Sequence, residues 1–364
     1  MEKEKIEIEG SSILITGAAG FIGTSLVMRI INDFLNVKVI GIDSMNDYYD
    51  ISLKEYRIGQ IEELLKRKRN IEWNFIKGDI SDDRLVNEVF QRYQPDMVIN
   101  LAAQAGVRYS IARPKSYIKS NIVGFFNIME ACRHSYDNGK NGVKHFVYAS
   151  SSSVYGGNTK IPYSTDDRTD SPVSLYAATK KCNELLAHSY AQLYGIPSTG
   201  LRFFTVYGPA GRPDMAYFKF TNKLKRNEKI ELYNYGKCKR DFTYIDDVIE
   251  CVVRVMQGAP KVPKDAHEVV FSPHAVYNIG AGKPINIMEF VKKLSEQLIN
   301  MGILSMDYNL DAHIRLVPMQ PGDVSVTYAD MVEFENDYGY LSMTSLGEGL
   351  KNFVMWYKDY YEEL

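Results

Sequence analysis

A glycine-rich turn between an expected strand and an expected helix limits what this chain can fold into more than any other feature. The apolar run 13–16 leads into Gly17, Gly20 and Gly23, and an amphipathic stretch begins at Phe21. This order predicts a buried strand, a tight turn and the N-terminus of a helix. Glycine has no Cβ, so the backbone can approach a ligand closely, and the free N–H groups of the helix start attract an anion. Taken alone, the motif is also compatible with a turn that binds nothing.

A carboxylate after the next expected strand supplies the second half of a dinucleotide site. The apolar run 37–42 ends at Asp43, about 20 residues after the last glycine. A carboxylate at this position can accept hydrogen bonds from both hydroxyl groups of an adenosine ribose, and it would repel a 2′-phosphate. The two features together favour NAD over NADP. The GxxGxxG spacing resembles that of the short-chain dehydrogenase/reductase superfamily.

Composition excludes several classes of function. A chain of 364 residues can bury a large core and has room for two lobes. A formal net charge of −2, with 24 % charged residues, gives no electrostatic reason to bind nucleic acid or an anionic membrane. Residues 1–10 alternate charged and apolar residues and lack the apolar core expected of a signal peptide, and no window holds the 18 or more apolar residues that a membrane span requires. Its four cysteines lack metal or redox spacing. We expect a cytoplasmic, reduced protein with no metal site.

Expected strands and helices alternate along the first part of the chain, with short connections between them. This alternation predicts a doubly wound parallel Rossmann sheet with helices on both faces. Ligands of such sheets bind at the carboxyl ends of the strands, where the strand order reverses. The expected strands are 13–16, 37–42, 71–76, 97–101, 146–149 and 198–204.

The pattern changes after residue 204, where glycine, proline and aromatic residues become frequent. We expect residues 1–204 to form an NAD-binding Rossmann domain, to which the chain returns at about 241–257. Residues 205–240 and 258–364 are expected to form a smaller, interleaved α/β substrate-binding lobe. This second part includes a proline-containing loop at 258–273. The crevice between the two lobes is the predicted ligand site.

A tyrosine and a lysine four residues apart carry the clearest catalytic signal. Tyr176 and Lys180 share one face of an expected helix, so the phenol and the ammonium project together. An isolated tyrosine titrates near pH ~10, but a nearby ammonium and a bound nicotinamide cation favour the phenolate. This would make Tyr176 a usable base near neutral pH. The alternative is two unrelated residues on a helix surface; the upstream glycine turn and strand-end serine favour the catalytic interpretation.

A run of four serines, Ser150 to Ser153, follows the expected strand 146–149. In the superfamily that this chain resembles, the catalytic hydroxyl lies three residues before the Val of Val-Tyr-Gly, which is Ser151 here. That hydroxyl would bond to the substrate oxygen and pass a proton. The neighbouring serines could instead satisfy backbone groups of the loop, so the identity of the acting serine stays open.

Together these motifs resemble the extended branch of the superfamily that acts on nucleotide sugars, and within it the UDP-glucuronate 4-epimerases. The segments that carry the resemblance are 41–50, 101–110, 202–215, 240–247 and 318–324. The resemblance implies C4 epimerisation of UDP-glucuronate to UDP-galacturonate through a 4-keto intermediate, with NAD tightly bound and recycled. It also implies a homodimer formed through the helices near 114–134 and 176–194.

The same resemblance implies which residues contact NAD. One of them, Asp79, lies at a strand end, where it could accept a hydrogen bond from adenine N6. Its alternative role, a helix N-cap, suits Ser81 or Asp82 better. The full implied set is Gly17, Gly20, Phe21, Ile22, Gly23, Asp43, Asn46, Asp79, Ile80, Ala102, Ala103, Gln104, Asn121, Tyr176, Lys180 and Phe203.

The substrate residues are also implied by resemblance. Thr205 stands where UDP-galactose 4-epimerases have Asn, and Arg212 would lie with it around the sugar carboxylate, beside Ser151, Ser152 and Ser153. An arginine fork matches a carboxylate in a bidentate manner. The alternative for Arg212 is a surface arginine in a loop.

Arg240 would bind the diphosphate, although a salt bridge with Asp246 or Asp247 is the alternative. UDP-galactose 4-epimerases also place an arginine just before Gly-Asp in the last motif. This chain has Gln320 and Pro321 before that dipeptide, so no diphosphate arginine is assigned there.

Three related functions remain as alternatives. UDP-glucuronate decarboxylases and 4,6-dehydratases carry an acidic residue directly after the strand-end hydroxyl residue, whereas this chain has Ser152. The missing acid favours epimerisation over decarboxylation. A UDP-glucose or UDP-galactose 4-epimerase is the second alternative. The third, a non-catalytic NAD-sensing protein, is disfavoured because Tyr176 and Lys180 are both present.

Overall fold

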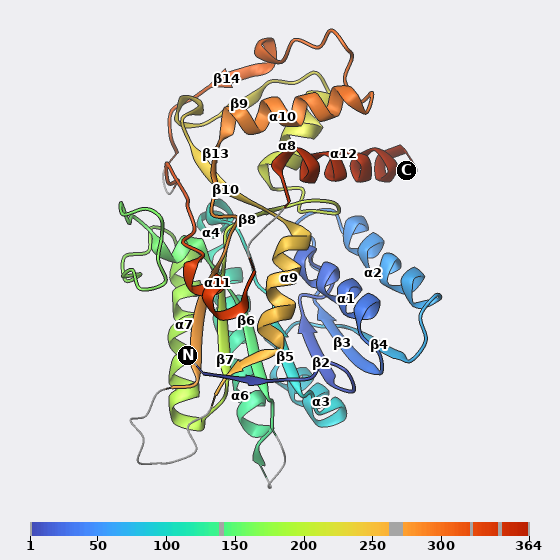
Figure 1. The fold of residues 1–364 in the computed structure, drawn as a ribbon, viewed down its shortest axis with the longest axis vertical. Coiled ribbons are helices and arrows are strands. Elements are labelled where there is room, and N and C mark those ends of the chain that lie inside the picture. Colours follow the sequence, from blue (N-terminus) through green and yellow to red (C-terminus); the bar gives the residue numbers. More distant parts are fainter. Residues whose placement is uncertain (1, 138–141, 262–271, 321–322, 341–343, 363–364) are drawn as a thin grey trace.

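A seven-stranded parallel sheet forms the larger lobe of the computed structural model (Figure 1). The structure describes residues 2–137, 142–261, 272–320, 323–340 and 344–362. The first strand of this sheet, β2, lies inside it; the chain runs outward to β4, then restarts at β5 on the other side of β2. The strand order therefore reverses between β2 and β5. From edge to edge the strands are β12 (His274–Ile279), β7 (Ser198–Phe203), β6 (His145–Ser151), β5 (Met97–Asn100), β2 (Ser12–Thr16), β3 (Val37–Asp43) and β4 (Ile71–Lys77).

Helices cover both faces of the sheet because successive strand residues point to opposite sides. Ile13 and Ile15 join one apolar core and Leu14 joins another. The first core includes α1 (Phe21–Asp33), α2 (Ser52–Leu65) and α9 (Ile245–Met256), and the second includes α3 (Asp83–Tyr93), α6 (Phe125–His134) and α7 (Leu175–Tyr194). The predicted doubly wound Rossmann sheet is confirmed.

The helical stretch predicted at 114–134 is present, with one irregularity in its centre. It begins as α5 (Pro114–Tyr117), passes through a π-helical segment at Ile118–Gly124, and continues as α6. A shorter helix, α4 (Val107–Ala112), precedes it. Segments of π-helix occur frequently at functional sites, and this one contains Asn121.

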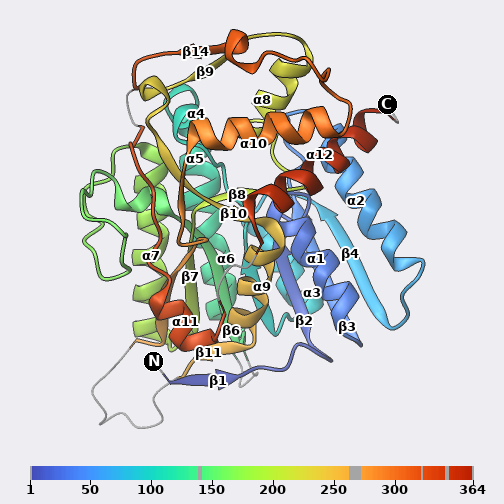
Figure 2. The same ribbon diagram turned by 45° about the horizontal axis from the view of Figure 1, so that its top comes forward.

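Within the described residues, the smaller lobe is built from short strands and the α-helices α8, α10 and α12, which lie above the sheet (Figure 2). Its main sheet has the order β13-β10-β8, in which β8 and β10 are parallel and β13 is antiparallel. A parallel pair, β9 and β14, lies farther from the large sheet (Figures 1 and 2). The bounds are β8 (Thr205–Tyr207), α8 (Ala216–Lys225), β9 (Ile230–Leu232), β10 (Lys239–Tyr244), β13 (Pro284–Asn286), α10 (Ile287–Asn300), β14 (Ile314–Leu316) and α12 (Leu346–Glu362).

One strand corrects the predicted domain boundaries. The predicted return at 241–257 includes α9, but β12 also belongs to the large sheet, with Tyr277 paired to Leu201 of β7. This strand lies in a segment that the sequence assigned to the smaller lobe. Its six residues directly follow the loop predicted at 258–273. The loop interrupts the alternation of strands and helices from which the other strands were predicted. Residues 262–271 of that loop lie outside the described residues, and Gly258–Pro260 forms β11, which pairs with β1 (Lys3–Lys5).

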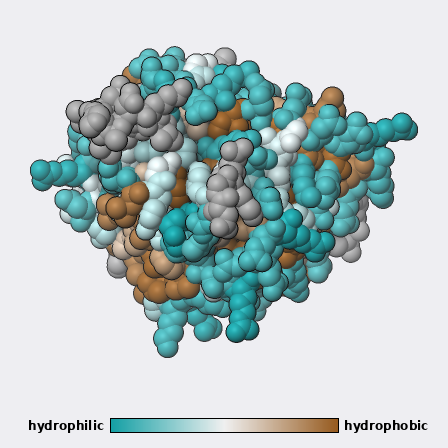
Figure 3. Space-filling model, turned by 90° about the horizontal axis from the view of Figure 1, so that it is seen from below, coloured by the Kyte–Doolittle hydropathy of each residue, from teal (hydrophilic) through white to brown (hydrophobic). Residues whose placement is uncertain are grey.

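The face of the molecule seen from below is mainly hydrophilic, and its apolar side chains form separate patches (Figure 3). Among the described residues, no helix has the length and apolar character needed to cross a bilayer.

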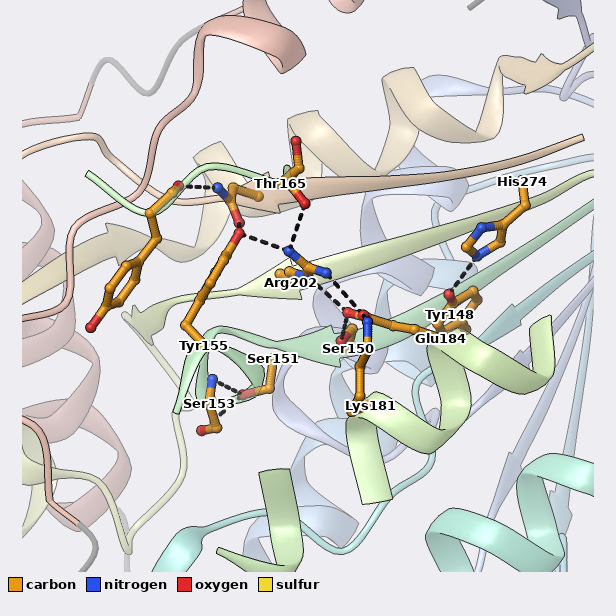
Figure 4. A network of polar contacts seen from close by, with 12 residues as sticks. Tyr148, Ser150, Ser151, Ser153, Tyr155, Thr165, Lys181, Glu184, Arg202 and His274 are labelled. Atoms are coloured by element: carbon orange, nitrogen blue, oxygen red, sulfur yellow. Dashed lines mark hydrogen bonds and ion pairs between the residues drawn. The ribbon is translucent and has the colours of Figure 1, made fainter. Parts of the chain in front are cut away.

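A buried polar network ties β6, β7 and α7 together beneath the sheet's carboxyl edge (Figure 4). Arg202 of β7 forms two hydrogen bonds with Glu184 of α7, at 2.8 and 2.9 Å. Ser150 donates a third bond to Glu184, at 2.7 Å, and Tyr155 accepts one from Arg202. Arg202 and Glu184 are each only 3 % exposed. The network therefore fixes the serine-containing end of β6 relative to α7.

We expect Arg202→Met to lower the free energy of unfolding by about 3–5 kcal/mol, because it leaves Glu184 buried without its main partner. Urea denaturation of the wild-type and variant proteins measures this loss. The matched control is Arg226→Met, which removes one exposed ion pair, with Glu228, and should cost less than about 1 kcal/mol. Equal losses in the two variants would contradict this account of the network.

Candidate active site

A pocket of about 660 Å³ lies at the carboxyl ends of the sheet strands, between the two lobes. The strand ends contribute Asp43, Ala102, Ser151 and Phe203 to its wall, and the smaller lobe contributes Arg240. This is the edge at which the strand order reverses, as expected for an open α/β sheet.

The glycine turn packs tightly against the neighbouring strands. Gly17 has φ +72°, and a Cβ on it would lie 2.8 Å from the backbone nitrogen of Ala102. A Cβ on Gly23 would lie 2.1 Å from the carbonyl oxygen of Gly17. The N-cap of α1 is Gly20, which makes no side-chain capping bond, and the first turn of α1 holds no acidic residue. Free N–H groups and the helix dipole therefore favour an anion such as a diphosphate here.

Asp43 is held at the end of β3 by backbone donors from two loops. It accepts hydrogen bonds from the N–H of Ala19 at 3.2 Å and of Met45 at 2.8 Å. Lys54 of α2 lies 3.7 Å from its carboxylate and donates to the carbonyl and side-chain oxygens of Asn46. Asp43 and Asn46 both line the pocket, where the sequence predicted a ribose site.

Asp79 lines the pocket but does not cap the following helix. Asp82 is the N-cap of α3, as expected. Asp79 accepts a hydrogen bond from the N–H of Ser81 and forms a 2.9 Å ion pair with Lys119. Although burial acts in the opposite direction, these contacts lower the pKa of Asp79.

Asn121 is the one predicted cofactor residue that the structure places behind the pocket wall. It is 1 % exposed and bonds to both the N–H and the carbonyl of Gln104, at 2.8 and 3.0 Å. Its amide also donates to Thr179 on α7. Asn121 thus fixes the loop that contains Gln104 instead of lining the pocket. The other predicted cofactor residues all line it.

Tyr176, Lys180 and Ser151 meet on one side of the pocket. Tyr176 and Lys180 belong to the first turns of α7, which begins after the N-cap Ser174. Lys180 donates a 2.8 Å hydrogen bond to the carbonyl oxygen of Ala149 at the end of β6. The hydroxyl of Ser151 lies near enough to Tyr176 to lower the pKa of its phenol. The hydroxyl of Ser151 also contacts Ser153, whereas Ser150 is turned to Glu184 (Figure 4).

Burial changes the pKa values of both Tyr176 and Lys180. Burial raises the pKa of Tyr176, while the nearby hydroxyl of Ser151 and the charge of Arg212 oppose that rise. Burial also lowers the pKa of Lys180 to about 7. Lys180 therefore carries only part of a positive charge near pH 7, and its expected effect on the phenolate stays a prediction. The contribution expected from a nicotinamide cation stays a prediction.

Arg212 lies on the pocket wall and not on an open surface loop. It forms a bidentate contact with Asp214, at 3.0 and 2.6 Å, and Tyr48 donates to the same carboxylate at 3.0 Å. Although burial opposes the charged form, Asp214 raises the pKa of Arg212. Asp214 occupies the one edge of this guanidinium that Nε and Nη2 form, and this contact fixes its orientation.

The remaining predicted substrate residues, Thr205, Ser152, Ser153 and Arg240, also line the pocket. Arg240 does not form the alternative salt bridge: it donates to the carbonyl oxygens of Lys239 and Ser325. The carboxylate of Asp247 accepts bonds from Tyr340 and Thr344 instead.

Several residues of the site were missed by the sequence analysis. All of them have charged or polar side chains, and tertiary contacts bring these side chains next to the residues that the sequence predicted. Lys54 and Arg57 lie on the same face of α2 as Leu53 and Ile61, and this face is buried. Two cationic side chains on an otherwise apolar helix face could have indicated, from the sequence, that these residues have buried polar partners. The missed residues are Tyr48, Lys54, Arg57, Arg108, Asp214 and Asp323.

The tight glycine turn, the uncapped N-terminus of α1 and the strand-end carboxylate fit a dinucleotide. Together with the tyrosine–lysine pair, they define a dinucleotide-dependent enzyme of the Rossmann type. Residues 13–280 match the NAD dependent epimerase/dehydratase family. The chain belongs to this family, and NAD is its cofactor.

Comparison with individual proteins gives the same class. Protein CapI of Staphylococcus aureus is 46% identical over 361 residues, covering 96% of this chain and 99% of that protein. UDP-glucuronate 4-epimerase 2 of Arabidopsis thaliana is 42% identical over 360 residues, covering 97% of this chain and 77% of that protein.

Solved structures of related enzymes are also similar. The UDP-glucuronic acid 4-epimerase from Bacillus cereus, in complex with UDP-glucuronic acid and NAD, gives a TM-score of 0.78 at 29% identity, covering 96% of this chain and all of that one. The UDP-glucose 4-epimerase of Thermotoga maritima, with UDP-glucose, gives a TM-score of 0.76 at 28% sequence identity. The match covers 96% of this chain and 99% of that one. The relatives therefore include epimerases of both acidic and neutral UDP-sugars.

We expect the buried Lys180 to make unfolding pH-dependent in the ligand-free protein. Its pKa falls from 10.5 to about 7 on folding, so between these values the unfolded state binds a proton that the folded state lacks. The stability of the wild-type protein relative to Lys180→Met should then rise with pH across this window. Urea denaturation at pH 7 and pH 9 measures it.

The control for this experiment is Lys292→Met, which removes an exposed lysine of α10. Its stability should follow that of the wild type at both pH values. Parallel pH dependence of the wild-type and Lys180→Met proteins would contradict the depressed pKa.

Proposed function

We propose that this protein is a UDP-glucuronate 4-epimerase, which interconverts UDP-glucuronate and UDP-galacturonate. The observation that carries the proposal is the position of Arg212. It shares the pocket with Tyr176, and its charge lies near enough to act on the pKa of the tyrosine. A cation so near the reacting group suits a carboxylate on the carbon next to C4.

NAD would supply hydride acceptance at C4 of the sugar and return of the hydride after rotation of the substrate. Tyr176 takes the proton of the C4 hydroxyl, and Ser151, whose hydroxyl lies near the phenol, donates a hydrogen bond to the same substrate oxygen. Lys180, which bonds to the carbonyl of Ala149, fixes the helix turn that carries Tyr176. When the sugar turns its other face, Tyr176 returns the proton, and no net oxidation results.

The smaller lobe is proposed to hold the nucleotide end of the substrate. Arg240 lines the pocket and donates hydrogen bonds to two carbonyl oxygens. Because these acceptors are neutral, they do not neutralise the charge of the guanidinium. That charge suits the diphosphate. The UDP moiety would thus stay anchored while the sugar rotates about its diphosphate linkage.

The chemistry of a uronic acid requires one further restraint. A 4-keto uronate is a β-keto acid, which loses CO₂ when its carboxylate bond stands perpendicular to the carbonyl plane. We assign the task of preventing this alignment to Arg212, Thr205 and the serines that follow Ser151. The absence of a carboxylate at Ser152 separates the proposal from decarboxylases and dehydratases.

We also propose a homodimer formed through the helical region 114–134 and α7. These segments pack against each other, and both expose large apolar side chains. Ile118 and Phe126 are each 44% exposed, and Leu185 and Leu193 are 58% and 71% exposed. A joint surface of this kind suits a second copy of the chain.

We expect Arg212→Lys to lower kcat/KM for UDP-glucuronate by at least about tenfold, because lysine cannot form the bidentate contact while Asp214 keeps a cationic partner. Turnover of UDP-glucose, which lacks the carboxylate, should fall less. The control is Arg226→Lys on the molecular surface. Equal effects of Arg212→Lys on both sugars would remove Arg212 from carboxylate recognition.

We expect Tyr176→Phe to lower kcat by about 10²–10⁴-fold, the range contributed by a positioned acid–base group. Binding of NAD, followed by fluorescence titration, should change little. Tyr190→Phe is the matched control, since Tyr190 lies on the same helix and donates to Glu130. Substantial activity of Tyr176→Phe would exclude the proposed base.

A further inference from the structure

Arg57 of α2 connects two loops that lie far apart in the sequence. The side chain is 1 % exposed. Its Nη1 donates to the carbonyl oxygen of Ala19 at 3.1 Å and to the hydroxyl of Tyr49 at 2.6 Å. Its Nε and Nη2 donate to the carbonyl oxygen of Ala210 at 2.9 and 2.7 Å, and Nη2 also reaches that of Gly211 at 3.1 Å. These bonds use all five N–H groups of the guanidinium.

The acceptors belong to the two halves of the proposed active site. Ala19 lies inside the glycine turn, between Gly17 and Gly20. Ala210 and Gly211 directly precede Arg212, the residue proposed to bind the sugar carboxylate. A single planar group therefore sets the distance between the cofactor turn and the substrate turn.

The substrate turn depends on outside support. Ala210 has φ +50°, a conformation that residues other than glycine rarely adopt. At Gly211, a Cβ would lie 1.7 Å from the hydroxyl oxygen of Tyr217. Arg57 supplies three hydrogen bonds to this strained turn, so a shift of its guanidinium shifts the backbone that carries Arg212.

The positive charge of Arg57 contributes to anion binding at the glycine turn, which a neutral side chain could not do. Its partners in these five bonds are neutral oxygen atoms. Burial of a charge among neutral partners is costly. A positive charge beside the glycine turn, however, adds to the attraction of the N-terminus of α1 for a diphosphate.

We propose that Arg57 is a positioning residue that couples the NAD site to the substrate site. A dinucleotide bound at the glycine turn fixes the position of Ala19, and the hydrogen bond from Arg57 to Ala19 then fixes the guanidinium. The guanidinium in turn holds the turn at 210–211, and this turn keeps Arg212 in the orientation that binds the sugar. Such coupling is reciprocal, so the sugar nucleotide strengthens NAD binding by the same factor. The inference rests on the proposed function for the contact between Arg212 and the sugar.

The test is to remove the retained NAD from the wild type and from Arg57→Lys, and then to measure the Kd of UDP-glucuronate by calorimetry for each full-length protein with and without saturating NAD added back. Lysine keeps the charge but cannot span both loops. We expect NAD to tighten binding in the wild type by about 5- to 150-fold, the usual range of coupling between two sites. In Arg57→Lys this factor should fall toward one.

The control is Arg254→Lys, since Arg254 donates to the carbonyl of Tyr338 outside the pocket lining. It should lower the melting temperature without changing the coupling factor. A coupling factor in Arg57→Lys equal to that of the wild type would overturn the proposal. If UDP-glucuronate fails to bind the wild type, the proposed function fails instead, and the comparison is made with the UDP-sugar that the wild type does bind.

A second measurement needs no variant. Hydrogen exchange of the wild-type protein should show that NAD alone slows amide exchange in residues 208–212, which carry the substrate turn. Unchanged exchange there, with slowed exchange in the glycine turn, would contradict the coupling even if Arg57→Lys proves too unstable to study.

Discussion

Two hydrogen bonds to the carbonyl oxygen of Ile42 hold the glycine turn against the end of β3, and the site is built outward from that contact. The N–H groups of Gly17 and Ala18 donate these bonds, at 2.7 and 3.1 Å. They place Ala19 so that its N–H reaches Asp43, which joins the expected diphosphate and ribose positions. They also direct the N-terminus of α1 toward the pocket. The remaining strands of the sheet end at the same edge, so their loops add the catalytic and substrate groups around this turn.

The sequence was sufficient where function depends on local geometry or on strand order. The glycine turn, Asp43 and the pair of Tyr176 and Lys180 are short-range patterns, and parallel strands bring them to one edge. Tertiary contacts could not be derived in this way. Strand β12 was missed because it follows the segment 258–273, which the sequence assigned to a loop of the smaller lobe, and because its pairing with β7 is a long-range contact. Asn121, predicted to contact the cofactor, lies in a π-helical segment and bonds to the backbone of Gln104, and its contact with NAD stays a prediction.

The charges of the pocket are largely arranged in pairs. Arg212 faces Asp214, Lys54 lies near Asp43, and Arg108 forms a 2.9 Å ion pair with Asp323. A substrate with a carboxylate and a diphosphate must compete with these anions for the cations beside them. Such competition favours ligands whose negative groups match the positions of the cations, so it gives selectivity more than binding strength.

The most direct test of the central claim is proton NMR of the purified protein with UDP-glucuronate and no added NAD. We predict that signals of UDP-galacturonate appear and approach a fixed ratio to those of the starting sugar, with NAD retained from purification. The appearance of UDP-xylose or of a 4-keto pentose together with CO₂ would contradict the account and identify a decarboxylase. If added NAD led to turnover of UDP-glucose but not of UDP-glucuronate, the role given to Arg212 would be wrong.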